Sequence, residues 1–138
     1  MLWNLTYADR DRWNEVYAIA GRPLPWWKRS GTSRMRLCEG PGPISALLEE
    51  TSDIKWANFQ RTQAGAILYF RVRLEVYGVP CAADSTSWHI HTHEGTKVLQ
   101  LEHAQGTVLL ELTSTPSVGT IRVLEEAFGP QSVSKVHK

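Results

Sequence analysis

Apolar residues near the N-terminus recur with a helical period, which predicts an amphipathic helix. The stripe consists of Leu5, Trp13, Val16, Tyr17 and Ala20. Thr6, followed three residues later by Asp9, resembles a capping box at the start of this helix. Gly21 and the prolines that follow it end the helix, because proline cannot continue a helical hydrogen-bond pattern.

From residue 34 onward the pattern changes to the alternation typical of strands. We expect strands at 35–39, 54–62, 66–79, 88–93, 97–103 and 107–113, with a hairpin turn around 63–65. In the segment 66–79, alternate residues point one way (Leu68, Phe70, Val72, Leu74 and Val76) and the others point the opposite way (Tyr69, Arg71, Arg73, Glu75 and Tyr77). One apolar and one polar face are typical of an antiparallel sheet.

Residues 44–51 fit either a short helix or a strand. Their length and the Ser52–Asp53 turn after them favour a strand.

The helical period returns near the C-terminus. Pro116 suits a first helical turn, and Val118, Ile121, Leu124 and Phe128 form an apolar stripe. Gly129 and Pro130 end this helix. We therefore expect one globular domain over residues 1–130 and a polar tail over 131–138.

A helix, about six or seven antiparallel strands and a final amphipathic helix define an α+β fold. This order of elements resembles the pleckstrin-homology (PH) superfold, which implies a PH-like barrel or a strongly curved sheet. The resemblance covers element order alone and carries no sequence motif, so it assigns no function to any residue. The alternative is a cystatin-like curved sheet wrapped around a helix.

Length and composition place the chain among small globular proteins. It has 138 residues, of which 42% are hydrophobic and 21% charged, as expected for one domain. The net charge of +1 argues against a general nucleic-acid binder. No signal-peptide pattern and no apolar run of membrane-spanning length is visible, so we expect no transmembrane segment and a soluble, cytoplasmic protein. Cys38 and Cys81 do not make a disulfide framework, although one bridge between them is conceivable.

The near-zero net charge hides one strongly basic segment. Residues 22–38 carry five positive charges and no acidic residue, so the remaining chain sums to −4. The candidate contact residues in this segment are Arg22, Trp26, Trp27, Lys28, Arg29, Arg34 and Arg36. Arginine and tryptophan together suit a protein partner or a small anionic ligand, through charge-assisted hydrogen bonds and stacking. The alternative is that both tryptophans cover the end of the sheet, as periodicity indicates for Trp13, Trp56 and Trp88 in the core.

A row of histidines provides the second candidate site. His89, His91 and His93 alternate along a predicted strand and therefore share one face. Imidazole nitrogen binds divalent transition metals, and His103, Glu94 or Glu102 could complete such a site. The alternative is that the three histidines occupy the solvent side of an outer strand.

Nothing in the sequence indicates nucleophilic catalysis or phosphate binding. There is no Gly-x-Ser-x-Gly motif, and the prolines of the 40–43 segment remove amide donors that a phosphate loop needs. We therefore expect a non-catalytic binding or assembly module without a cofactor, capable of forming homo-oligomers through a sheet edge or an apolar face. The alternative is a metal-binding protein or metalloenzyme centred on His89, His91 and His93. Arg71 and Arg73 on the polar strand face form a third candidate, and an enclosed pocket there would instead favour small-molecule binding.

Overall fold

The chain folds into one antiparallel sheet of eight strands with three α-helices in a computed structural model that describes residues 2–113 and 118–132. The elements are β1 (Trp3–Asn4), α1 (Arg10–Ala20), the 3-10 turn η1 (Trp26–Lys28), β2 (Met35–Glu39), α2 (Gly42–Leu48), β3 (Trp56–Thr62), β4 (Gly65–Val72), β5 (Glu75–Ala82), the 3-10 turn η2 (Ala83–Ser85), β6 (Ser87–His93), β7 (Thr96–His103), β8 (Gly106–Glu111) and α3 (Val118–Phe128). The strand order is β1-β5-β4-β3-β2-β8-β7-β6. The α+β prediction is thus confirmed, with more strands than expected. The sheet does not close into a barrel, because β1 and β6 form its two edges within the described residues.

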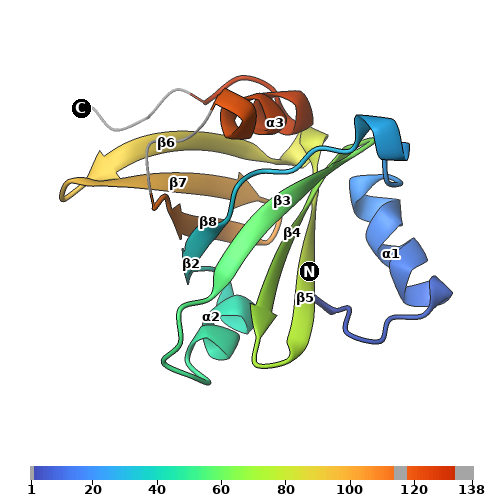
Figure 1. Cartoon of the computed structure of the whole chain (residues 1–138), viewed down its shortest axis with the longest axis horizontal. Coiled ribbons are helices and arrows are strands. Elements are labelled where there is room, and N and C mark those ends of the chain that lie inside the picture. Colours follow the sequence, from blue (N-terminus) through green and yellow to red (C-terminus); the bar gives the residue numbers. More distant parts are fainter. Residues whose placement is uncertain (1, 114–117, 133–138) are drawn as a thin grey trace.

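The sheet is strongly bent, so that β6 and β7 run across the direction of β3, β4 and β5 (Figure 1). The main core lies on the inner face of this bend, where α3 covers the strands. Phe128 of α3 packs edge-to-face on Phe59 of β3, with ring centroids 6.0 Å apart. The Trp88 indole Nε1 donates a hydrogen bond to the Gly129 carbonyl at 2.9 Å, which ties β6 to the end of α3.

Helix α1 packs on the opposite face of the sheet, against β4 and β5 (Figure 1). Its buried side chains Val16 and Ala20 contact Leu5 and Ile67, which confirms the predicted stripe. The predicted capping box is wrong, because the Asp9 side chain caps the helix by accepting from the Arg12 amide at 2.9 Å.

Helix α2 corrects the strand expected at 44–51. A proline in the first turn pre-sets the helical backbone angle, and the Ser45 hydroxyl donates to the Gly40 carbonyl at 2.7 Å. At the other end of the helix, the Lys55 ammonium donates to the Leu48 and Thr51 carbonyls at 3.4 and 2.6 Å. Helix-end carbonyls need such partners, and a lysine four residues beyond the segment supplies them.

The segment expected as one strand over 66–79 is a hairpin. β4 ends at Val72, which pairs with Glu75, so Arg73 and Leu74 form a two-residue turn and Leu74 is 85% exposed. Arg73 has a φ of +57°, as such tight turns require. After the turn the faces exchange: Tyr77 stacks on Phe70 at 5.6 Å on the core side, whereas Val76 lies opposite Arg71. The core-facing positions predicted for Leu74 and Val76 are therefore wrong.

The remaining strands and the last helix agree with the prediction to within a few residues. Ile121, Leu124 and Phe128 pack in or against the main core, but Val118 is exposed. Pro116 and most of the predicted tail lie outside the described residues, while Ser132 hydrogen-bonds through its amide to the Trp88 carbonyl at 2.7 Å. Among the described helices, none has the length and apolar character needed to span a membrane.

Candidate functional site

The basic, aromatic loop is anchored to β3 at two points and protrudes between them. Pro23 forms a bridge with Thr62, and Gly31 forms a bridge with Gln60. The amide of Arg61 donates to the Ser30 carbonyl at 2.9 Å. Between these anchors Leu24 is buried, whereas residues 25–29 are exposed and bulge away from the sheet, with η1 in the bulge.

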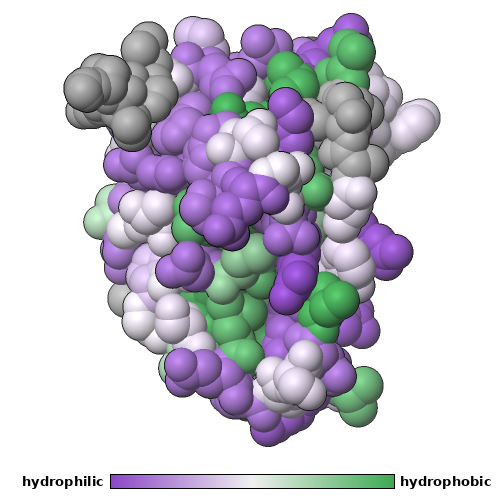
Figure 2. All heavy atoms as spheres, turned by 90° about the vertical axis from the view of Figure 1, so that its left-hand side faces the viewer, coloured by the Kyte–Doolittle hydropathy of each residue, from purple (hydrophilic) through white to green (hydrophobic). Residues whose placement is uncertain are grey.

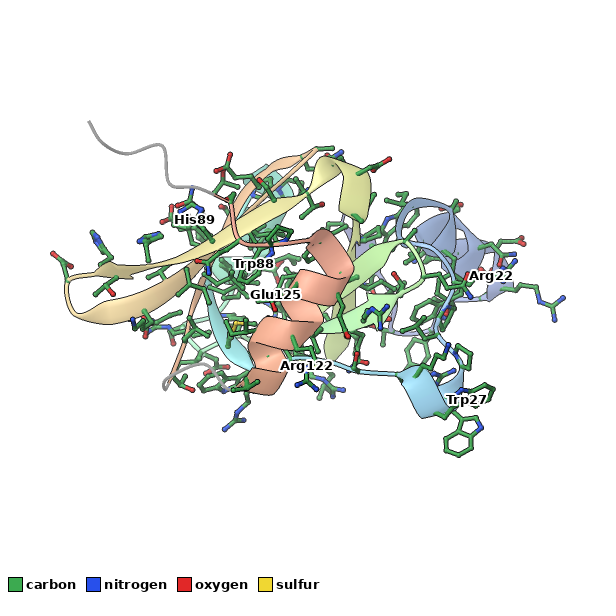
Figure 3. The ribbon with its side chains drawn as sticks, turned by 90° about the horizontal axis from the view of Figure 1, so that it is seen from above. Arg22, Trp27, Trp88, His89, Arg122 and Glu125 are labelled. Atoms are coloured by element: carbon green, nitrogen blue, oxygen red, sulfur yellow. The ribbon has the colours of Figure 1, made fainter. Side chains whose placement is uncertain are left out.

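Both tryptophans of η1 face solvent. Trp26 is 78% exposed and Trp27 is 66% exposed, and their rings meet edge-to-face at 5.8 Å. Figure 3 shows Trp27 projecting away from the body of the protein, at the end opposite to His89. Burying a large aromatic side chain is strongly favourable, so two exposed tryptophans in one turn are unusual for a surface with only a structural role. The alternative in which both cover the end of the sheet is therefore wrong.

The five positive charges of the segment form two pairs, with Arg22 apart from both. Lys28 and Arg29 are exposed beside the tryptophans, and the Arg29 Nε donates to the Leu24 carbonyl at 3.0 Å, which fixes that side chain along the loop. We call Trp26, Trp27, Lys28 and Arg29 the loop tip. Arg22 is exposed and directly precedes the first anchor, Pro23.

The other two arginines lie beside the outer face of β3. The Arg34 guanidinium lies 4.4 Å from the ring centroid of Trp56, a cation–π contact. Arg36 is on β2 and forms an ion pair of 3.9 Å with Glu111. The prediction that Trp56 faces the core is wrong, because Ala57 and Phe59 take the core positions of β3. The sequence does carry a signal for this arrangement, because the apolar Ala57 and Phe59 alternate with the polar Asn58 and Gln60.

The three histidines of β6 do not converge on one point. The His89 and His91 rings are 5.3 Å apart between centroids, whereas the His93 Nε2 lies 3.7 Å from a carboxylate oxygen of Glu94. His103 uses its Nδ1 to accept the Gln105 amide at 3.2 Å. Over residues 2–113 and 118–132, no group of three or more His, Cys, Asp or Glu side chains is arranged to hold a metal ion.

The side of the molecule that carries the end of the β6–β7 hairpin is mainly polar. Figure 2 shows its hydrophobic surface as a narrow band between larger hydrophilic areas.

The two cysteines do not form a disulfide bridge. Cys81 is buried in the core and Cys38 is exposed, and both are free thiols.

The third candidate, the pair Arg71 and Arg73, lies at a groove. Arg71 and Arg73 line an open groove of about 470 Å³, not the enclosed pocket that would mark the protein first as a small-molecule carrier. All four side chains of the loop tip are exposed, so we retain it as the first candidate contact surface.

Comparison with protein-family models, with curated proteins and with solved structures finds no match to this chain. A function therefore has to be argued from the chemistry of these surfaces.

Proposed function

We propose that this protein is a non-catalytic binding module that docks onto an acidic segment of a partner protein through the loop tip. The observation that carries the proposal is the exposure of Trp26 and Trp27, at 78% and 66%, beside Lys28 and Arg29. Tryptophan and arginine dominate the energetic centres of protein interfaces, because they combine large apolar area with directed polar groups.

Charge complementarity selects an acidic partner over a neutral one. No carboxylate occurs between residues 22 and 38, so the loop tip has no acidic neighbour in its own segment. An acidic partner would gain long-range attraction toward this loop and would then bury the two indole rings. The affinity should accordingly fall as ionic strength rises.

A displayed library of random peptides tests this proposal. We expect selection on the intact protein to enrich peptides that combine acidic and apolar residues. Binding should weaken by about tenfold or more in Trp26→Ala and Trp27→Ala, the range of an interface hot spot. Tyr7→Ala is the matched control, because Tyr7 is 97% exposed but lies outside the loop.

Two outcomes would contradict the proposal. Selected peptides without acidic residues would remove the charge argument, and unchanged binding by both tryptophan variants would remove the loop. Light scattering over a concentration series checks whether the loop instead recognises a second copy of the chain, which would make the protein a homo-oligomer.

The finer fold class is part of the same proposal. A PH-like class is supported by the order of sheet and final helix, and a cystatin-like class by α1 packing on one face of a bent sheet.

A further inference from the structure

A groove on the outer face of β3, β4 and β5 has aromatic walls and contains Arg71, whose side chain forms no ion pair with the described residues. Its volume is about 470 Å³, within the range of sites that hold small organic molecules. It is lined by Thr51, Asp53, Ile54, Lys55, Trp56, Asn58, Tyr69, Phe70, Arg71, Arg73 and Val76. The loop tip is not part of this lining, so the groove is a separate surface from the one in the proposed function.

The strand register explains why aromatic and polar groups meet here. Asn58 of β3 lies directly opposite Tyr69 of β4, and Trp56 and Arg71 are each two residues away on the same face. Ile54 adds an apolar rim, and it is one of the few large aliphatic side chains that are exposed among the described residues. The walls of the groove therefore suit a flat apolar ring.

Trp56 in the wall of the groove already contacts a cation. The Arg34 guanidinium covers the Trp56 ring at 4.4 Å, which adds positive charge near the groove. A phenol is already protonated at neutral pH at its ordinary pKa of about 10, and burial raises the pKa of Tyr69 further, to about 12. Its hydroxyl can then donate a hydrogen bond to an anion.

Three cations line the groove, and two are engaged elsewhere. Arg73 forms an ion pair of 3.1 Å with Glu50, and the Lys55 ammonium donates to carbonyls at the end of α2. Over the described part of the chain, Arg71 has neither an ion pair within 4.0 Å nor a hydrogen bond from its side chain. One free guanidinium matches one carboxylate, and Asp53 in the lining disfavours a more highly charged anion.

We propose that this groove binds a small aromatic carboxylate, with its ring against Trp56 and Tyr69 and its carboxylate on Arg71. A carboxylate paired in two parallel hydrogen bonds with a guanidinium fixes the direction of the ligand, while the ring supplies apolar area. An uncharged ring would retain only the second contribution.

Calorimetric titration with naphthoate tests the site, with naphthamide as the uncharged comparison. We expect saturable binding of naphthoate and binding of naphthamide weaker by about tenfold or more. Arg71→Gln should lower the affinity for naphthoate by a similar factor without changing the affinity for naphthamide. Arg71 is exposed, so this substitution leaves the core intact.

Two control variants separate this site from others. Arg73→Gln removes a neighbouring charge that is already paired, and it should change naphthoate affinity by less than about threefold. The double variant Trp26→Ala/Trp27→Ala should bind naphthoate normally, which distinguishes the groove from the loop tip. The proposal is overturned if naphthoate does not saturate, if Arg71→Gln binds it as well as the parent, or if the double variant loses it.

Discussion

Replacing Trp26 by alanine tests whether the loop tip is a contact surface or a part of the core. Trp26 is 78% exposed, so folding removes only about a fifth of its surface from water. For a side chain of roughly 250 Å², this is about 55 Å² and, at ~25 cal/mol/Å², an upper estimate of ~1.4 kcal/mol. Loss of the edge contact with Trp27 adds ~0.5 kcal/mol.

We therefore expect Trp26→Ala to lower the free energy of unfolding by about 1–2 kcal/mol. Trp88→Ala is the contrasting variant, because Trp88 is 1% exposed and its removal should cost about 3–5 kcal/mol. Guanidinium unfolding followed by circular dichroism measures both values without relying on tryptophan emission. A loss of 3 kcal/mol or more for Trp26→Ala would show that η1 covers the core, and the proposed docking function would lose its basis.

Three further predictions concern the core and the titrating groups. Trp88→Phe should lower the free energy of unfolding by about 2–3 kcal/mol, because it deletes the hydrogen bond to Gly129 and leaves a small cavity. Chemical denaturation measures this loss, and a value below ~0.5 kcal/mol would contradict the prediction. Ellman's reagent should titrate only Cys38 in the native protein and both thiols after denaturation, since burial raises the pKa of Cys81 to about 12; rapid native reaction of both would contradict the buried position. Burial lowers the pKa of His103 below its ordinary 6.5, so the unfolded chain binds more protons and stability should fall as pH drops below about 6.5. Part of that loss of stability should be absent in His103→Asn. Identical melting temperatures of the two proteins between about pH 7 and about pH 5 would refute the contribution of His103.

Strand positions could be predicted where alternation continued without a turn. β6, β7 and β8 follow apolar alternation bounded by glycine-containing turns, and the structure places them within one or two residues. The β4–β5 hairpin was missed because its two-residue turn preserves the alternation of apolar residues while it exchanges their faces. Arg73 carries no glycine or asparagine signal, although it occupies a left-handed conformation.

Helix α2 was missed for a different reason. Its seven residues are too few to show a helical period, so only its ends could have identified it. One end is a proline in the first turn, which can be read from sequence. The other end depends on the Lys55 ammonium, which approaches the helix carbonyls only after the chain has turned into β3.

The two candidate sites differ in how far sequence alone can reach them. The loop tip is contiguous, so residues 26–29 could be found from composition, and only their exposure needed the structure. The groove is assembled from β3, β4, β5 and the segment before β3, and its defining property is that Arg71 remains uncommitted while Arg73 pairs with Glu50. Two arginines that look equivalent on one strand thus acquire different roles because the turn after Val72 sends Arg73 toward Glu50. Pairing, which depends on tertiary contacts, therefore decides which arginine is available to a ligand.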